Sequence, residues 1–171
     1  MGYLGQTILK SVPRFCLFAN KVVYLHDGQK KRFMQTHPTS SSQPDSASGL
    51  CEHLGIRFVS MEEGLVTATM PVDERTCQPF GILHGGASLA LAESVAGQGS
   101  LQLCQQGYVP CGIQVSGNHL RMVRLGQTVT AQGRLLYGGK SQHVWSVDIM
   151  APDGELVSTV RVVNQIVKRR A

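Results

Sequence analysis

The feature that most limits the fold of this chain is a run of small side chains between residues 85 and 100. Eleven of these sixteen residues are Gly, Ala or Ser. A helix with so little apolar side chain has little to bury, and its small residues make sense if other backbone approaches closely. The segment from residue 85 to about residue 105 is therefore predicted to be one helix around which a sheet wraps tightly.

Strand patterns flank this helical segment. Alternation with a period of two residues, or a high content of β-branched residues, predicts strands at residues 65–70, 128–136, 143–150 and 155–167, and residues 109–119 are a fifth candidate strand. Residues 143–150 and 155–167 are joined by Ala-Pro-Asp-Gly, a strong turn sequence, and residues 50–54 are a candidate short helix. One strand, one helix and then four strands predict an α+β fold with an antiparallel sheet around one helix.

The positive charge of the chain is confined to its first part. The formal net charge is +5, and residues 1–33 carry six basic side chains against Asp27, so residues 34–171 are neutral. A nucleic-acid footprint needs a basic face, and none is expected on the folded part. Residues 34–48 are rich in Ser, Pro and Thr, which favours disorder. We predict a basic extension and flexible linker over residues 1–48 and one compact domain over residues 49–171.

Two interpretations of the first 33 residues stay open. A basic, acid-poor segment suits a mitochondrial-type presequence, although it lacks the apolar run and cleavage site of a secretory signal. Alternatively, Met34 is the natural start, because the domain needs nothing from the residues before it.

Composition also limits compartment and cofactors. Five cysteines, without CxxC or Cys/His spacing, argue against a disulfide framework or structural zinc and favour the reducing cytoplasm. No apolar run approaches the ~20 residues of a membrane span, so no membrane role is expected. The six histidines are scattered and no HExxH, P-loop or GxGxxG motif follows a strand, so neither a metal nor a cofactor is expected.

One carboxylate stands alone in the helical segment. Between Arg75 and Arg121 the single formally charged residue is Glu93. A carboxylate among small apolar residues is costly to bury unless it has partners or a task, and desolvation raises a carboxyl pKa toward the range of a general base. The alternative is that Glu93 lies on a solvated stripe with Ser94 and Gln98.

The spacing of His84 from Glu93 adds a geometric condition. Nine residues of helix correspond to about 900°, or half a turn, and a rise of about 13 Å. The two side chains therefore point to opposite sides of a common helix. If they share an active site, that site has to form across a two-fold subunit interface. His84 as a simple capping or packing residue is the competing interpretation.

The sequence QPFGILHGGASLALAES, starting at Gln78, resembles the signature of hotdog-fold thioesterases of the phenylacetate-degradation type. The resemblance extends from about residue 50 to residue 167 and is strongest to the branch of 1,4-dihydroxy-2-naphthoyl-CoA hydrolases and enterobactin proofreading thioesterases. It implies a hotdog fold, with an antiparallel sheet wrapped around one long central helix. It also implies a homodimer or a homotetramer built as a dimer of dimers.

The resemblance assigns roles to four residues. Glu93 matches the catalytic carboxylate, which acts as a general base on water or as a nucleophile. Gly85 matches the residue whose backbone N–H polarises the thioester carbonyl. Gln78 and His84 match residues beside the thioester, with Glu93 arriving from the neighbouring subunit.

Further positions match the substrate-binding residues of the family. Ser94 and Gln98 would line the acyl pocket. His119 and Arg121 would lie near the pocket and the pantetheine arm of CoA. The loop of Gly139, Lys140 and Ser141 would bind the CoA nucleotide, where a lysine and exposed N–H groups suit phosphate. The resemblance implies CoA only as part of the substrate.

The leading hypothesis is a thioesterase acting on an aromatic acyl-CoA, with the 1,4-dihydroxy-2-naphthoyl ester of menaquinone synthesis as the single best substrate. A broad-specificity thioesterase for medium-chain or phenylacetyl-type esters is the alternative of the same class. A hydratase or dehydratase of the same fold would also pair a His with a helix carboxylate. A catalytically silent acyl-CoA-binding module would bind CoA esters without turnover and leave Glu93 exposed.

Overall fold

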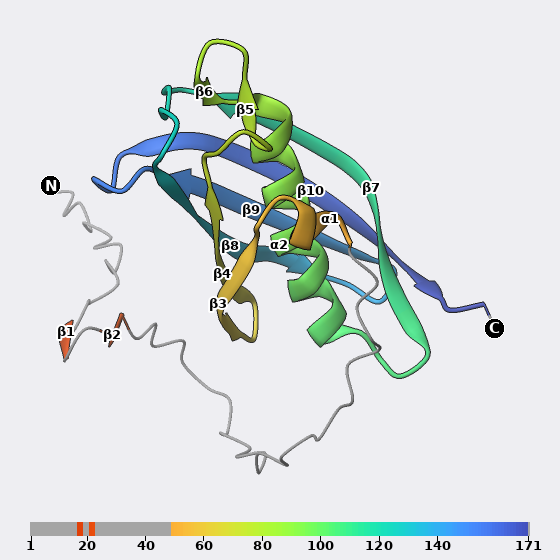
Figure 1. Cartoon of the computed structure of the whole chain (residues 1–171). Helices are drawn as coiled ribbons and strands as arrows, with labels where there is room; N and C mark the ends of the chain where they lie inside the picture. Colours follow the sequence, from red (N-terminus) through yellow and green to blue (C-terminus); the bar gives the residue numbers. More distant parts are fainter. Residues whose placement is uncertain (1–16, 19–20, 23–48, 171) are drawn as a thin grey trace, which may run out of the picture. The chain divides into compact units, whose positions relative to one another are not determined.

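The computed structural model describes residues 17–18, 21–22 and 49–170 (Figure 1). The chain divides into two units, Met1–Ser42 and Gln43–Ala171, which are considered separately. In the first unit, β1 (Leu17–Phe18) pairs with β2 (Lys21–Val22) in antiparallel fashion. The predictions of a flexible linker, of a presequence and of a start at Met34 otherwise lie outside the described residues.

The second unit is a six-stranded antiparallel sheet with a long helix, α2 (Gly85–Leu103), against its concave side (Figure 1). The strand order is β3-β4-β8-β9-β10-β7. The bounds are Arg57–Glu62 for β3, Leu65–Pro71 for β4, Tyr108–His119 for β7, Thr128–Gly138 for β8, Gln142–Met150 for β9 and Leu156–Lys168 for β10. The short helix α1 (Leu50–His53) precedes β3. The predicted α+β fold is confirmed.

The sheet wraps closely around α2 because small residues face each other at the contact. The helix packs against β4, β7, β8, β9 and β10. A Cβ at Gly133 on β8 would lie 2.5 Å from Cγ1 of Val95, and one at Gly99 on the helix would overlap the Trp145 indole. Carbon atoms pack at about 3.5–4 Å, so neither position has room for a larger residue. The reason given for the small-residue run is thereby confirmed.

A buried polar network fixes the C-terminal half of α2 to the sheet. Nε1 of Trp145 donates to Oγ of Ser100 at 2.9 Å, and Nδ2 of Asn164 donates to the same oxygen at 2.9 Å. Nδ2 of Asn164 also donates to the Ala96 carbonyl at 3.1 Å. All these side chains are buried, so the network sets one angular position of the helix against β9 and β10.

Strand β3 is absent from the predicted order, which placed one strand before the helix. The pattern fails there because β3 is an edge strand whose residues are mostly exposed, and a register shift between Phe58 and Ser60 breaks its alternation. Two more short strands, β5 (Cys77–Gln78) and β6 (Ile82–Leu83), precede α2 in the chain and pair with each other. Two residues are too few to show periodicity.

The opposite edge of the sheet is β7, and it is unusually long and open. Eleven of its twelve residues pair with β10 on one side, and the exception is Ile113, at a register shift. Most of the twelve are exposed, including Ile113 at 57%. A long strand with a free edge is a template for pairing with another chain.

In the described part of the chain, no helix is long and apolar enough to cross a membrane. The same residues contain no cluster of three or more potential metal ligands.

Candidate active site

The N-terminus of α2 is organised by His84. This residue is the extended N-cap, and its Nδ1 accepts a hydrogen bond from the Gly86 N–H at 2.8 Å. Its carbonyl accepts the N–H groups of Ala87 and Ser88 at 3.0 and 3.2 Å. Within the described residues, the N–H of Gly85 is therefore left without a protein acceptor at the positive end of the helix dipole. A carbonyl or oxyanion is the natural partner for that group.

His119 lies directly beside Gly85. A Cβ on Gly85 would be 2.7 Å from Nε2 and 2.9 Å from Cδ2 of the His119 ring, so any larger residue would displace the imidazole. Nδ1 of His119 is 2.9 Å from Oγ of the fully buried Ser158. This hydrogen bond orients the ring, and Nε2 is left facing the helix N-terminus.

A pocket of about 410 Å³ opens over this helix end. Its polar lining comes from Gln78, Gly85, Ser88, His119 and Arg121, and its apolar lining from Ile82, Leu83, Leu120, Met122 and Val157. Four of the predicted site residues are thus brought together from β5, α2 and the end of β7. A pocket of this size, apolar with a few converging polar groups, suits a small-molecule thioester.

Ion pairs hold the segments around this pocket. Arg121 is 3.2 Å from Asp153 and 3.8 Å from Glu155, both near the β9–β10 turn. Arg75 binds Asp73 through its guanidinium and donates to the His53 carbonyl at 3.0 Å, which fixes the segment before Gln78. The hydrogen bonds from Arg75 lower the pKa of Asp73. The predicted role of Arg121 toward pantetheine stays a prediction, and its guanidinium already has these two carboxylate neighbours.

Glu93 lies apart from the pocket, as the helical spacing predicts. It is exposed in the single chain, eight residues and about 12 Å of helix beyond Gly85. Its Oε1 occupies the space where a Cβ of Gly112 on β7 would be. The general-base interpretation assumed that Glu93 is buried, and one subunit does not bury it. Its exposure agrees both with the solvated-stripe interpretation and with a site that a second subunit completes.

Two polar residues, Ser94 and Gln98, lie near Glu93 on the same helix. The Ser94 hydroxyl donates to the Ala90 carbonyl at 2.7 Å, which turns it toward the helix backbone. Gln98 is half-buried one turn further along. Neither lines the pocket at the helix N-terminus, so their assignment to the acyl group stays a prediction.

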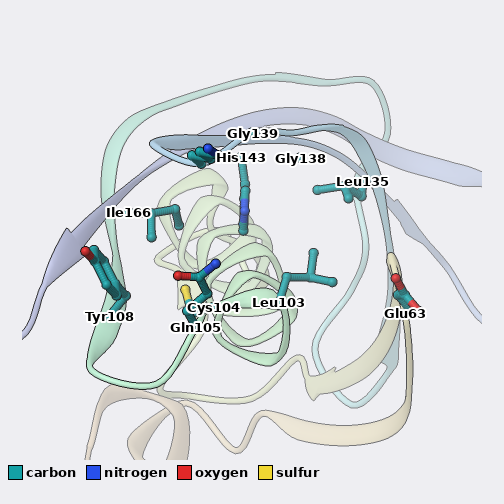
Figure 2. A pocket seen from close by; sticks show the side chains of 11 residues that line it. Glu63, Leu103, Cys104, Gln105, Tyr108, Leu135, Gly138, Gly139, His143 and Ile166 are labelled. Carbon is teal, nitrogen blue, oxygen red and sulfur yellow. The ribbon is translucent and has the colours of Figure 1, made fainter. Parts of the chain in front are cut away.

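The predicted nucleotide loop lies at the other end of α2. Gly139 and Lys140 line a separate pocket with Leu103 and Cys104 at the helix C-terminus (Figure 2). Ser141 is exposed, and its carbonyl accepts the N–H of Ile166 at 2.8 Å. Within one chain, this loop cannot reach a ligand bound at Gly85, because the nineteen-residue helix between them is about 27 Å long.

Sequence reasoning missed two residues with clear structural roles. Ser158, which orients His119, lies inside a strand of β-branched residues, where a serine gives no distinguishing signal. His143 is buried at the pocket near the helix C-terminus, and the pattern predicted it only as a strand residue.

Comparison with known proteins gives consistent matches. Residues 80–158 match the family model of the thioesterase superfamily. The chain is 40% identical to a 1,4-dihydroxy-2-naphthoyl-CoA hydrolase of Escherichia coli, over 66% of this chain and 82% of that protein. It is 39% identical to a proofreading thioesterase of Cronobacter turicensis, over 68% and 85%. A thioesterase structure from Haemophilus influenzae superposes with a TM-score of 0.68 at 37% identity, covering 71% of this chain and 85% of that one.

Proposed function

This chain belongs to the hotdog thioesterases of the thioesterase superfamily, and from that membership we propose that it hydrolyses an aromatic acyl-CoA. The best single substrate is 1,4-dihydroxy-2-naphthoyl-CoA, the substrate that the name of the Escherichia coli relative specifies. The observation that carries the proposal is the unpaired Gly85 N–H at the helix N-terminus, which opens into the pocket of Gln78 and His119.

The proposed chemistry starts with the thioester carbonyl oxygen at the Gly85 N–H. Water attacks the carbonyl carbon, and the Glu93 carboxylate takes the proton of that water. The oxyanion that forms is stabilised by the Gly85 N–H and the helix dipole. When the intermediate collapses, the C–S bond breaks, and the CoA thiolate leaves and takes up the proton. His119 Nε2 and Gln78 lie close enough to the pocket to orient the ester.

A nucleophilic Glu93 is the other route to the same products. Its carboxylate would attack the carbonyl and form a mixed anhydride, which water then hydrolyses. One turnover in ¹⁸O-labelled water tests for this route. Label in the Glu93 side chain after a single turnover shows attack by the carboxylate followed by addition of water at the Glu93 carbon of the anhydride. Label in the released acid alone is expected for a general base, and also for addition of water at the acyl carbon of the anhydride.

The proposed site needs two subunits. The free edge of β7 supports an antiparallel two-fold pairing with the same edge of a second copy. Such a pairing would bring Glu93, which lies over Gly112 on β7, toward the helix N-terminus of the partner subunit. The loop of Lys140, at the far end of the helix, would then extend past the partner's pocket, where it could reach the nucleotide of CoA.

Mixing two inactive variants tests this shared site. Glu93→Ala and Gln78→Ala each remove one side of it, but a mixed dimer contains one pocket with both residues intact. Refolding the two variants together in equal amounts should restore about a quarter of the wild-type activity, because half of the dimers are mixed and half of their sites are intact. No recovery would mean that each subunit contains its own complete site.

The substrate is tested with a panel of dihydroxynaphthoyl-, benzoyl-, phenylacetyl- and straight-chain acyl-CoAs, with thiol release as the readout. The dihydroxynaphthoyl ester should be hydrolysed fastest, and Glu93→Ala should abolish most of the turnover while the protein stays folded. A preference for straight chains would contradict the aromatic assignment and favour the broad-specificity alternative. Hydration of a 2-enoyl-CoA without thiol release would instead identify a hydratase.

A further inference from the structure

The imidazole of His119, the last residue of β7, lies against Gly85 at the N-terminus of α2. The position that a Cβ of Gly85 would occupy is 2.7 Å from Nε2, 2.9 Å from Cδ2 and 3.4 Å from Cε1 of the ring. These three distances place it over the face of the ring, so the in-plane bond from Nε2 to a hydrogen runs alongside the glycine and not into it. Among the described residues Nε2 has no hydrogen-bond partner, and His119 lines the pocket over the helix end. Nε2 is therefore available to a ligand in that pocket.

Ser158 on β10 decides which nitrogen of this ring carries the hydrogen. The residue is fully buried, and among the described residues its hydroxyl has one side-chain partner, Nδ1 of His119 at 2.9 Å. If Nδ1 donated to that oxygen, the hydroxyl hydrogen would be buried without an acceptor, which is costly. Donation from Ser158 to Nδ1 satisfies the hydroxyl and leaves the hydrogen of the neutral ring on Nε2. A doubly protonated ring carries a hydrogen on Nε2 as well.

Two donors thus meet at the helix end, the backbone N–H of Gly85 and the Nε2–H of His119. Covalent geometry places a backbone nitrogen about 2.5 Å from the Cβ position of its own residue, so the two donor nitrogens are at most about 5 Å apart. Two donors that each lie about 2.9 Å from one shared oxygen can be up to about 5.8 Å apart. A single oxygen atom in the pocket can therefore accept both hydrogen bonds.

We propose that His119 is a catalytic residue whose Nε2–H forms a two-donor oxyanion hole with the Gly85 N–H, and that Ser158 is the positioning residue that holds the hydrogen on Nε2. The thioester carbonyl oxygen accepts both hydrogen bonds, which strengthen as the attack of water gives this oxygen its negative charge. The hydrogen stays on Nε2 throughout, so His119 transfers no proton. This inference rests on the proposed thioesterase function and adds to it a second donor for the oxyanion.

The position of the hydrogen is measured first, by ¹⁵N NMR of the full chain at the pH of the activity assay. Imidazole nitrogen shifts distinguish a protonated from an unprotonated Nε2, and His119→Asn identifies the His119 signals among those of the six histidines. We expect Nε2 of His119 to be protonated in the wild type. In Ser158→Ala the neutral ring should divide between two tautomers, and kcat should fall in proportion to the loss of the Nε2–H form. A wild-type ring with its only hydrogen on Nδ1 refutes the proposal.

Two substitutions of matched chemistry test the catalytic role. The amide of His119→Asn reaches about as far as Nδ1, so this variant can keep the contact with Ser158 but has no donor at the position of Nε2. The longer side chain of His119→Gln can place an amide N–H near that position. Loss of an oxyanion donor costs about 10²- to 10³-fold in kcat, so we expect a loss of that size in His119→Asn, with KM changed less than about threefold.

The glutamine variant should recover at least about tenfold of that loss, because it restores a donor to the oxyanion. Thermal unfolding of both variants controls for folding. An equal loss of kcat in His119→Asn and His119→Gln, or a raised KM at unchanged kcat, would mean that the ring packs or binds without stabilising the oxyanion, and either result overturns the proposal.

A readout without turnover separates this inference from the proposed function. The probe is the ketone analogue of benzoyl-CoA, in which a CH₂ group replaces the sulfur, with a ¹³C label in its carbonyl group. Hydrogen bonds to a carbonyl oxygen lower its infrared stretching frequency, so the bound ketone should absorb at a lower frequency in the wild type than in His119→Asn. If the wild type releases thiol from an ester but the stretching frequency and kcat are unchanged in His119→Asn, the second donor is refuted and the thioesterase stands. If the wild type releases no thiol from any ester, the proposed function fails and this inference fails with it.

Discussion

The position of Glu93, as distinct from its presence, is tested by changing a residue that does no chemistry. In Gly112→Ala, the added methyl group falls on the Oε1 of Glu93. Gly112 lies in β7 beside a register shift, but it pairs with Asn164 and does not have a left-handed backbone conformation, so alanine is compatible with its backbone. The substitution therefore moves the carboxylate and leaves it charged and present.

The size of the effect follows from the overlap. Ordinary van der Waals contact requires about 3.4 Å, so the carboxylate oxygen must retreat by about 1 Å. A misplacement of about 1 Å can cost about 100-fold in rate, which corresponds to about 2.7 kcal/mol in the barrier. Stability should change little, because the obstacle is the exposed end of a flexible side chain. Removing the carboxylate in Glu93→Ala should cost more, about 10³- to 10⁴-fold.

A double-mutant cycle isolates the contact between these two residues. The kcat values of the wild type, Gly112→Ala, Glu93→Ala and the double variant are measured by thiol release, with thermal unfolding as the control for folding. Because Glu93→Ala leaves nothing to displace, Gly112→Ala should have almost no further effect in that background. The coupling should be about 2.7 kcal/mol, nearly the whole effect of the single glycine substitution.

Two results would refute the reasoning. Full activity in Gly112→Ala would show that the carboxylate needs no fixed position at Gly112 to work. An equal loss of rate in both backgrounds would show that the methyl group acts on something else, such as the pairing of β7 edges. A dimer-to-monomer shift measured by sedimentation would identify that second cause.

The remaining predictions concern the packing of α2 and the titration of His143. Gly99→Ala should lower the unfolding free energy by about 1–3 kcal/mol, because its methyl group overlaps the Trp145 ring; Gly97→Ala, which adds a methyl group with no atom within 4 Å, should instead stabilise the helix by up to about 1 kcal/mol in urea unfolding. Ser100→Ala leaves the Trp145 indole N–H without its acceptor and should cost about 1–3 kcal/mol, with altered tryptophan emission. As pH falls below 6.5, the unfolded chain takes up a proton before the folded His143 does, so stability should fall by up to about 1.4 kcal/mol per pH unit. His143→Leu should remove that part of the slope, and an unchanged slope would contradict the lowered pKa.

The helix could be predicted from its run of small residues, and β4, β8, β9 and β10 from residues that alternate between buried and more exposed positions. Strand β9, for example, alternates buried and half-buried positions along its whole length after Gln142. The strand β3 could not be predicted, because an exposed edge strand with a register shift has no buried face to generate the pattern. Periodicity reports burial, and it is silent where little is buried.

The candidate site also has some features that the sequence predicts and others that it does not. The helix cap at His84, the free Gly85 N–H and the separation of Glu93 from them follow from local chain geometry, which sequence spacing expresses directly. Ser158 and His143 depend on which strand neighbours which in space, and no spacing along the chain encodes that neighbourhood. Assignments that rest on resemblance alone, such as the nucleotide loop of Lys140, stay predictions until the partner subunit and a ligand are placed.

The composition of α2 also explains where chemistry can be located in this fold. A helix of Gly, Ala and Ser allows the sheet to approach, but it supplies few functional side chains of its own. Its reactive groups are therefore the backbone N–H groups at one end and the single carboxylate of Glu93, about 12 Å away along the axis. One chain cannot bring these two together, whereas a two-fold axis near the middle of β7 can, because it sets each helix beside the other in reverse direction. In the proposed mechanism, the thin helix that closes the sheet is thus the same feature that makes a second subunit necessary for catalysis.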